Sequence, residues 1–210
     1  MRRLRLILLT IVLLVLVWSG IGPHDRATWF LEVGPVLIGV PLLVATYRKV
    51  PLTGLAYFLL ALHAVILMVG GHYTYARVPL FDWIRDSLDL TRNHYDRVGH
   101  FAQGFVPAIV TREVLLRFSP LRRGKWLAFL VVSVCLAISA SYELLEWLTA
   151  AIAGSAAEDF LGTQGDVWDT QKDMLLAAIG AIIALAMLGR RHDRSLAALD
   201  ASAAPAIDDE

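Results

Sequence analysis

Carboxylate and imidazole side chains occur at helical spacing in this chain, and they are the residues best suited to chemistry. They form three groups, which are Asp96 with His100, Glu143 with Glu146, and Asp166 with Asp169 and Asp173. Spacings of three, four and seven residues place the members of each group on one face of a helix. Carboxylate oxygens with one or two imidazoles suit Mg²⁺, Mn²⁺, zinc or iron. The residue types therefore predict a site for a divalent cation.

A metal-dependent enzyme is the first function that this pattern predicts. The expected metal ligands are Asp96, His100, Glu143, Asp169 and Asp173. Three of them, Glu143, His100 and Asp96, are also the candidate catalytic residues, because each can exchange a proton with a substrate. The residues expected around them, as supports or substrate contacts, are His72, Tyr75, Glu146 and Asp166. A cation held there would polarise a phosphoryl or carbonyl oxygen, or activate water. The sequence does not identify the metal.

Each of these residues also has an ordinary structural explanation. The two glutamates could form ion pairs with arginines, namely Arg77, Arg92 or Arg97. The aspartates of the third group could stabilise the amino terminus of a helix, with Asp166 as its cap. Single histidines are more often packing residues than ligands. The convergence of all three groups on one region is what favours a binding or catalytic site.

The composition indicates a membrane protein. Apolar residues make up 57% of the 210 residues and charged residues 18%, whereas soluble domains are nearer half apolar and a quarter charged. The apolar residues are grouped in long blocks, and the single cysteine, Cys135, excludes an internal disulfide. A charged side chain at the centre of a membrane helix costs about 2.5–3.5 kcal/mol, so such residues are functional candidates by default.

Six apolar blocks are long enough to cross a bilayer, so the predicted fold class is all-α, a polytopic membrane bundle of six transmembrane helices. The expected helices cover residues 4–21, 29–47, 52–71, 98–118, 126–150 and 172–189. Arginine and lysine cluster before the first block, in alternate loops and after the last block, which predicts that both termini are cytoplasmic. This topology places the three acidic groups on the outer face of the membrane.

The remaining segments complete the predicted organisation. Residues 1–194 are expected to form one transmembrane domain, with its first helix retained because no small-x-small cleavage site follows it. A short amphipathic helix containing Leu80, Trp83 and Leu88 is expected at the outer interface. The Ala-rich, acidic segment 195–210 is expected to be a disordered cytoplasmic tail.

Four strings between residues 70 and 174 resemble the YjdF family of bacterial inner-membrane proteins. They are GGHYTYARVPL, DRVGHFAQGF, YELLEW and DFLGTQGDVWDTQKDM, and the likeness extends from about residue 63 to residue 180. The resemblance implies a multi-pass protein of the bacterial inner membrane. It implies no particular biochemical activity.

A more distant likeness is to VanZ-like membrane proteins, a family associated with glycopeptide resistance and envelope stress. The string that opens a helix in that family is matched by Asp96, Arg97, His100 and Phe101. Two later positions differ, because Glu146 and Asp173 stand where the VanZ-like pattern has amides. These acids make the site better suited to a divalent cation, and they weaken any transfer of VanZ-like function.

Three classes of function are compatible with the sequence. The first is an enzyme with a His/carboxylate site on the outer face that acts on a lipid-linked or envelope substrate. The second is a non-catalytic membrane scaffold or a lipid-headgroup binding protein. The third is a proton-coupled transporter, in which intramembrane acids would relay protons. Membrane lipid or a lipid-linked molecule is the expected partner, a homo-oligomer is a further possibility, and no nucleic acid is expected.

Overall fold

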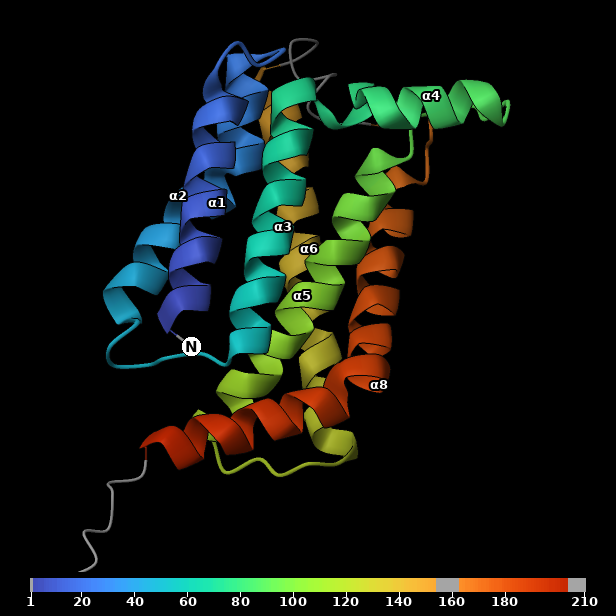
Figure 1. The fold of residues 1–210 in the computed structure, drawn as a ribbon. Coiled ribbons are helices and arrows are strands. Elements are labelled where there is room, and N and C mark those ends of the chain that lie inside the picture. Colours follow the sequence, from blue (N-terminus) through green and yellow to red (C-terminus); the bar gives the residue numbers. More distant parts are fainter. Residues whose placement is uncertain (1, 154–162, 204–210) are drawn as a thin grey trace, which may run out of the picture.

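The computed structural model describes residues 2–153 and 163–203, and these segments are built from helices (Figure 1). In chain order the elements are α1 (Arg2–Gly20), α2 (Arg26–Thr46), α3 (Gly54–Tyr73), the 3₁₀ turn η1 (Tyr75–Arg77), α4 (Pro79–Ser87), α5 (Tyr95–Phe118), α6 (Lys125–Ala153) and α8 (Asp169–Ala203).

The long helices run alternately between two ends of the molecule (Figure 1). One end carries the short helix α4, which lies across the bundle, and is called the α4 end below. The other, the amino-terminal end, carries the start of α1 and the last part of α8. Helices α5 and α8 therefore begin at the α4 end, and α6 ends there. This alternation brings the three acidic groups of the sequence to one end of the bundle.

The prediction of an all-α membrane bundle is confirmed. Within the described ranges, five helices are long and apolar enough to cross a membrane, namely α1, α2, α3, α6 and α8. Helix α5 is not among the five because polar residues such as Asp96, Arg112 and Glu113 interrupt its apolar surface, and these side chains are buried. Since α5 packs against α3, α6 and α8, it needs less apolar surface of its own. The six-span count and the cytoplasmic position of both termini stay predictions.

Helices α5 and α8 make the most extensive helix–helix contact of the described chain. Two glycines make this contact possible. A Cβ atom at Gly104 would lie 1.7 Å from the carbonyl oxygen of Ala177, and a Cβ atom at Gly180 would lie 2.2 Å from that of Phe101. Small residues allow membrane helices to approach this closely. The contact fixes how the first turns of α5 and α8 face each other at the α4 end.

Glu113 joins α5 to α3 and α8 near the amino-terminal end. Its Oε1 accepts hydrogen bonds from the Thr53 backbone N–H at 2.9 Å and from Arg117 at 3.0 Å. Its Oε2 accepts from the Thr53 hydroxyl at 2.7 Å and lies 3.1 Å from Nε2 of His192. Thr53 is itself the N-cap of α3. Glu113 therefore fixes the start of one helix against the interior of two others.

Helix α8 extends to Ala203, well past its predicted end at residue 189. Its last part turns across the amino-terminal end of the bundle (Figure 1), where Leu196 and Leu199 are buried and Arg112 donates to Asp193 at 2.7 Å. Residues 195–203 are thus helical, which corrects the expectation of a disordered segment there. The physical reason is the pair of leucines, which gain apolar contacts only when the segment is helical. Residues 204–210 lie outside the described chain.

Candidate functional site at the α4 end

Two arginines neutralise part of the acidic group at the start of α8. Arg92 Nη1 donates to Asp169 Oδ1 at 2.6 Å, and Arg97 Nη2 donates to the same oxygen at 2.5 Å. Arg97 also pairs with Asp166 at 3.1 Å and with Asp173. Because Asp169 and Asp173 are only 6% and 2% exposed, these ion pairs are largely shielded from water. The predicted ligand Asp169 thus lies between two guanidinium groups.

His100 lies at the centre of the remaining carboxylates, and both of its ring nitrogens face acids. Its Nε2 is 3.4 Å from Asp96 Oδ1 and 3.9 Å from Asp173 Oδ2. Its Nδ1 is 3.7 Å from Glu143 Oε1. All four residues are buried, and they come from α5, α6 and α8. Four of the five predicted metal ligands are therefore brought together, with the imidazole between them.

The geometry divides these four residues into two roles. One ligand atom each from Asp96, His100 and Asp173 lies within 4.8 Å of the other two, so these three residues could hold a small cation. A tetrahedral site with bonds of about 2.1 Å has ligand atoms about 3.4 Å apart, close to the separations measured from Nε2. Glu143 faces the opposite ring nitrogen, so it can only accept the Nδ1–H proton while Nε2 serves as a ligand.

Nδ1 of His100 and Oε1 of Glu143 are buried, and neither has a hydrogen-bond partner within the described residues. Their separation of 3.7 Å exceeds a normal hydrogen bond, which is about 2.7–3.2 Å for N–H···O. Buried polar atoms are normally paired, because leaving one unpaired costs about 1–3 kcal/mol. A small movement of either side chain would form the bond. A ligand bound to Nε2 would fix the tautomer that carries its proton on Nδ1. The Nδ1–H could then donate to Glu143 Oε1, which would close the gap between the two atoms.

Negative charge exceeds positive charge in this cluster. The carboxyl side chains are those of Glu32, Asp96, Glu143, Glu146, Asp166, Asp169 and Asp173, and six of the seven are buried, the exception being Asp166. Among the described residues, the basic side chains that lie close to these carboxylates are those of Arg92, Arg97, His100 and the exposed Lys172. Burying unpaired carboxylates is costly, so the excess must be met by protons or by a bound cation.

The loops that hold the site in place meet through Asn93 and Gln164. The Asn93 N–H donates to Gln164 Oε1, and Gln164 Nε2 donates to the Asn93 carbonyl, each at 2.9 Å. Asn93 Nδ2 also donates to Asp82 of α4 at 3.0 Å, and α4 is the amphipathic helix that the sequence predicted. Gly165, with φ of 85°, adopts a backbone conformation that favours glycine. This turn delivers Asp166 and Asp169 to the arginines.

Asp166 is the most solvent-accessible acid of the cluster. The Lys172 amine donates to its Oδ2 at 2.6 Å. This hydrogen bond, with a second from the Trp168 backbone N–H, holds the pKa of the Asp166 carboxyl below its ordinary value. Asp166 therefore stays ionised and acts as a bridge between Arg97 and Lys172. Its hydrogen bond from the Trp168 backbone N–H resembles the capping role that the sequence suggested for Asp166.

His72 and Tyr75 lie outside the His100 cluster. The Nδ1 atom of His72 is 3.0 Å from the Ser19 carbonyl oxygen, and its ring centroid is 4.4 Å from that of Trp18. Tyr75 is buried where α3 and α5 meet, and a Cβ atom at Gly70 would lie 2.3 Å from its ring. His72 therefore has a packing role in this structure, whereas the Tyr75 hydroxyl lies within hydrogen-bonding range of the buried Glu32. Glu146 is buried one helical turn from Glu143.

Comparison with known proteins places the chain in a family. Residues 4–194 match the family described as "Predicted membrane protein (DUF2238)". Inner membrane protein YjdF of Escherichia coli (strain K12) is 55% identical over 183 residues, which cover 87% of this chain and 88% of that protein. The chain belongs to this family. It is a multi-pass protein of the inner membrane, and the YjdF resemblance is confirmed. No solved structure matches it. The more distant VanZ-like likeness stays a prediction.

Sequence reasoning missed two members of the site in this YjdF-family protein. Glu32 of α2 is 4% exposed and accepts a hydrogen bond from the Tyr142 hydroxyl at 2.7 Å. It lies within electrostatic range of Glu146. The available signal was a lone acid inside an apolar membrane segment, which marks a functional candidate. Tyr142 gave no such signal, because a tyrosine in an apolar helix is ordinary.

Proposed function

We propose that this protein binds one divalent cation at the α4 end of the bundle and acts there as a metal-dependent enzyme on a lipid-linked or envelope substrate. The observation that carries the proposal is the set of three buried ligand atoms, one each from Asp96, His100 and Asp173. Zinc sites with three protein ligands and an open fourth position are typically catalytic, whereas structural sites are closed by four. On the predicted topology, the α4 end faces away from the cytoplasm.

The proposed role of each residue follows from its position in the cluster. Asp96, His100 and Asp173 would hold the cation, which would supply a Lewis acid for a phosphoryl or carbonyl oxygen. Glu143 would accept the Nδ1–H of His100 and so orient the ring, as carboxylates do behind metal-bound histidines. Glu146, buried one helical turn from Glu143, would support that side chain. Asp169, which is held by Arg92 and Arg97, would position these arginines rather than bind the cation.

Elemental analysis of the purified protein tests the cation site. We expect about one zinc or manganese ion per chain in the wild type, and at least tenfold weaker retention in Asp96→Asn, because one of three ligands loses its charge. The matched control is Asp166→Asn, which removes an acid of the same cluster that lies outside the ligand set. In the wild type, saturating metal at about 100 Kd should raise stability by about 2.7 kcal/mol.

The results separate the cation site from the catalytic role. Absence of zinc, manganese and magnesium from the wild type, with no thermal shift on adding any of them, would overturn the cation site. If metal binds, phosphate release from lipid phosphates by the metal-loaded protein in detergent tests the enzyme. The His100→Gln variant should abolish that release, and metal binding without any turnover would reject the catalytic role.

A second candidate is a non-catalytic scaffold, which the Arg92–Asp169–Arg97 arrangement favours. These ion pairs join the loop before α5 and α5 itself to the first turn of α8, so part of the cluster has a structural role already. In this case the Asp96→Asn and Asp166→Asn variants would lose stability to a similar extent, and the metal content of the wild type would be negligible.

A further inference from the structure

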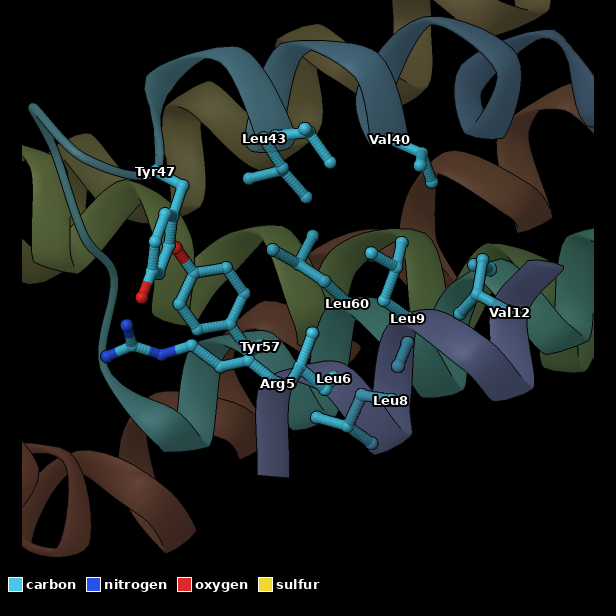
Figure 2. A pocket seen from close by; sticks show the side chains of 13 residues that line it. Arg5, Leu6, Leu8, Leu9, Val12, Val40, Leu43, Tyr47, Tyr57 and Leu60 are labelled. Carbon is cyan, nitrogen blue, oxygen red and sulfur yellow. The ribbon is translucent and has the colours of Figure 1, made fainter. Parts of the chain in front are cut away.

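An apolar pocket lies between α1, α2 and α3, in the half of the bundle nearer its amino-terminal end (Figure 2). Its volume is about 310 Å³, and leucine and valine side chains of α1 and α2 form much of its wall. Ala61 and Ala64 of α3 also line it, and their small side chains leave the space open. Ligand pockets in proteins occupy about 300–1,000 Å³, so this one suits a slender ligand.

One end of the pocket carries a fixed positive charge. The Arg5 guanidinium carbon lies 5.1 Å from the ring centroid of Tyr47 and 5.1 Å from that of Tyr57. Figure 2 shows these three side chains together at one end, with Val12 and Val40 towards the other. Contacts with two aromatic rings hold a guanidinium in place. The pocket thus combines an apolar body with a cation at its entrance.

The other end of the pocket is closed by the protein core. Val12, Val33, Val36, Ala64 and Met68 form a cluster of buried side chains from α1, α2 and α3. A ligand in the pocket would therefore lie along the helices with its polar end beside Arg5. Since α1 and α2 both expose leucine and isoleucine side chains outside this cluster, the entrance lies beside an apolar outer surface.

The residues of α1 to α3 that surround the Arg5 end carry positive charge only. Asp25 and Glu32 are the only acids among residues 1–81, and both lie at the α4 end of α2. At the Arg5 end, Arg48 and Lys49 are exposed directly after Tyr47. Arginine binds phosphate through several donors in a planar fork. The entrance is therefore complementary to an anionic group attached to an apolar chain.

We propose that this pocket binds one acyl chain of an anionic phospholipid, with the lipid phosphate against Arg5. The pocket takes up part of one acyl chain and leaves the second chain in the bilayer. On the predicted topology, Arg5 lies at the cytoplasmic leaflet, whose surface is negatively charged by anionic lipids. The site is separate from the cation cluster, which lies at the opposite end of the bundle. Its test therefore does not depend on the proposed enzyme.

Native mass spectrometry of the delipidated protein, titrated with phosphatidylglycerol or phosphatidylcholine, tests the site. We expect one retained lipid, with phosphatidylglycerol bound about five- to tenfold more tightly. Both lipids offer a phosphate to Arg5, but phosphatidylglycerol is anionic overall, whereas the choline cation of phosphatidylcholine is repelled by the positive charge of Arg5. Arg5→Gln should bring the two affinities together, while Arg5→Lys should keep part of the preference. Ala61→Phe should fill the pocket and reduce retention of both lipids at least tenfold.

The control for filling the pocket is Ala186→Phe, which adds the same ring to an exposed position on α8. Thermal unfolding in detergent first confirms that each variant is folded. Equal retention of both lipids by the wild type would overturn the role of Arg5. Unchanged retention in Ala61→Phe would overturn the pocket as the binding site. Retention of detergent alone, or of a second copy of the chain in place of lipid, would reject the proposal.

Discussion

Glu113 is fully buried and holds partners on three helices, and this makes it the residue whose loss the fold would tolerate least. Its two carboxylate oxygens form hydrogen bonds with Thr53, Arg117 and His192. Of these three, only Arg117 is a near neighbour in the chain, one helical turn away at the spacing of a local ion pair. The partners on α3 and α8 are 60 and 79 residues away in the chain, so no local pattern identifies them. At the scale of single residues, long-range polar pairing is what sequence reading misses.

Replacing Glu113 with alanine should lower the free energy of unfolding by about 3–5 kcal/mol, because it leaves buried partners without their counter-charge. The measurement is unfolding of the purified protein in mixed detergent. Arg123→Gln is the control, since Arg123 also forms an ion pair, with Asp193, but its side chain is 59% exposed. That change should cost less than about 1 kcal/mol. Similar losses for the two variants would contradict the role given to Glu113.

The pair of helices α5 and α8 is the element on which the candidate site depends. Asp96 and His100 lie on α5, while Asp169 and Asp173 lie on α8. The backbone contact at Gly104 and Gly180, two to three turns further along, sets the rotation and distance between the two helices. Sequence spacing placed each acid on a helical face, but it could not give the rotation of one helix against the other. This is why it did not assign Asp169 to the arginines.

Gly104→Ala should therefore disturb both stability and the cation site. The new methyl group would lie 1.7 Å from the Ala177 carbonyl oxygen, and overpacking of this kind costs about 1–3 kcal/mol. Displacing α8 would separate Asp173 from His100 and weaken metal retention. Gly39→Ala is the control, because nothing lies within 4 Å of a Cβ atom there and alanine favours the helix by about 1 kcal/mol. Equal behaviour of both variants would rule out this coupling.

The whole molecule raises the question of whether α5 crosses the membrane. Cysteine labelling answers it in a Cys135→Ala background, since Cys135 is buried. Cysteines at Ser87 and at Arg122, both exposed, lie before and after α5. We expect a membrane-impermeant maleimide to label position 87 in intact spheroplasts, and position 122 only in inverted vesicles. Labelling of both positions from the same side would reject the six-span topology.

Much of the overall architecture followed from the sequence, because lipid requires long apolar segments and these are visible as blocks. The site was predicted in part. His100, Asp96, Glu143 and Asp173 come together as expected, since alternating helices carry them to one end. Glu32 and its contact with Tyr142 were not predicted, because that pairing joins residues 110 positions apart. The helical end of α8 was also missed, since two leucines in an alanine-rich segment are a weak signal.

The position of α8 at the end of the chain has a consequence for biosynthesis. Arg97 and Glu113 are made with α5, but their partners Asp173 and His192 follow 76 and 79 residues later. At about 5–20 residues per second, a ribosome needs roughly 4–16 s to add them. During that interval Arg97 lacks its acidic partners, whereas Glu113 already has Thr53 and Arg117. A ribosome that stalls before α8 would release a product in which Arg97 lacks its ion pairs. We expect membrane proteases to degrade such a product.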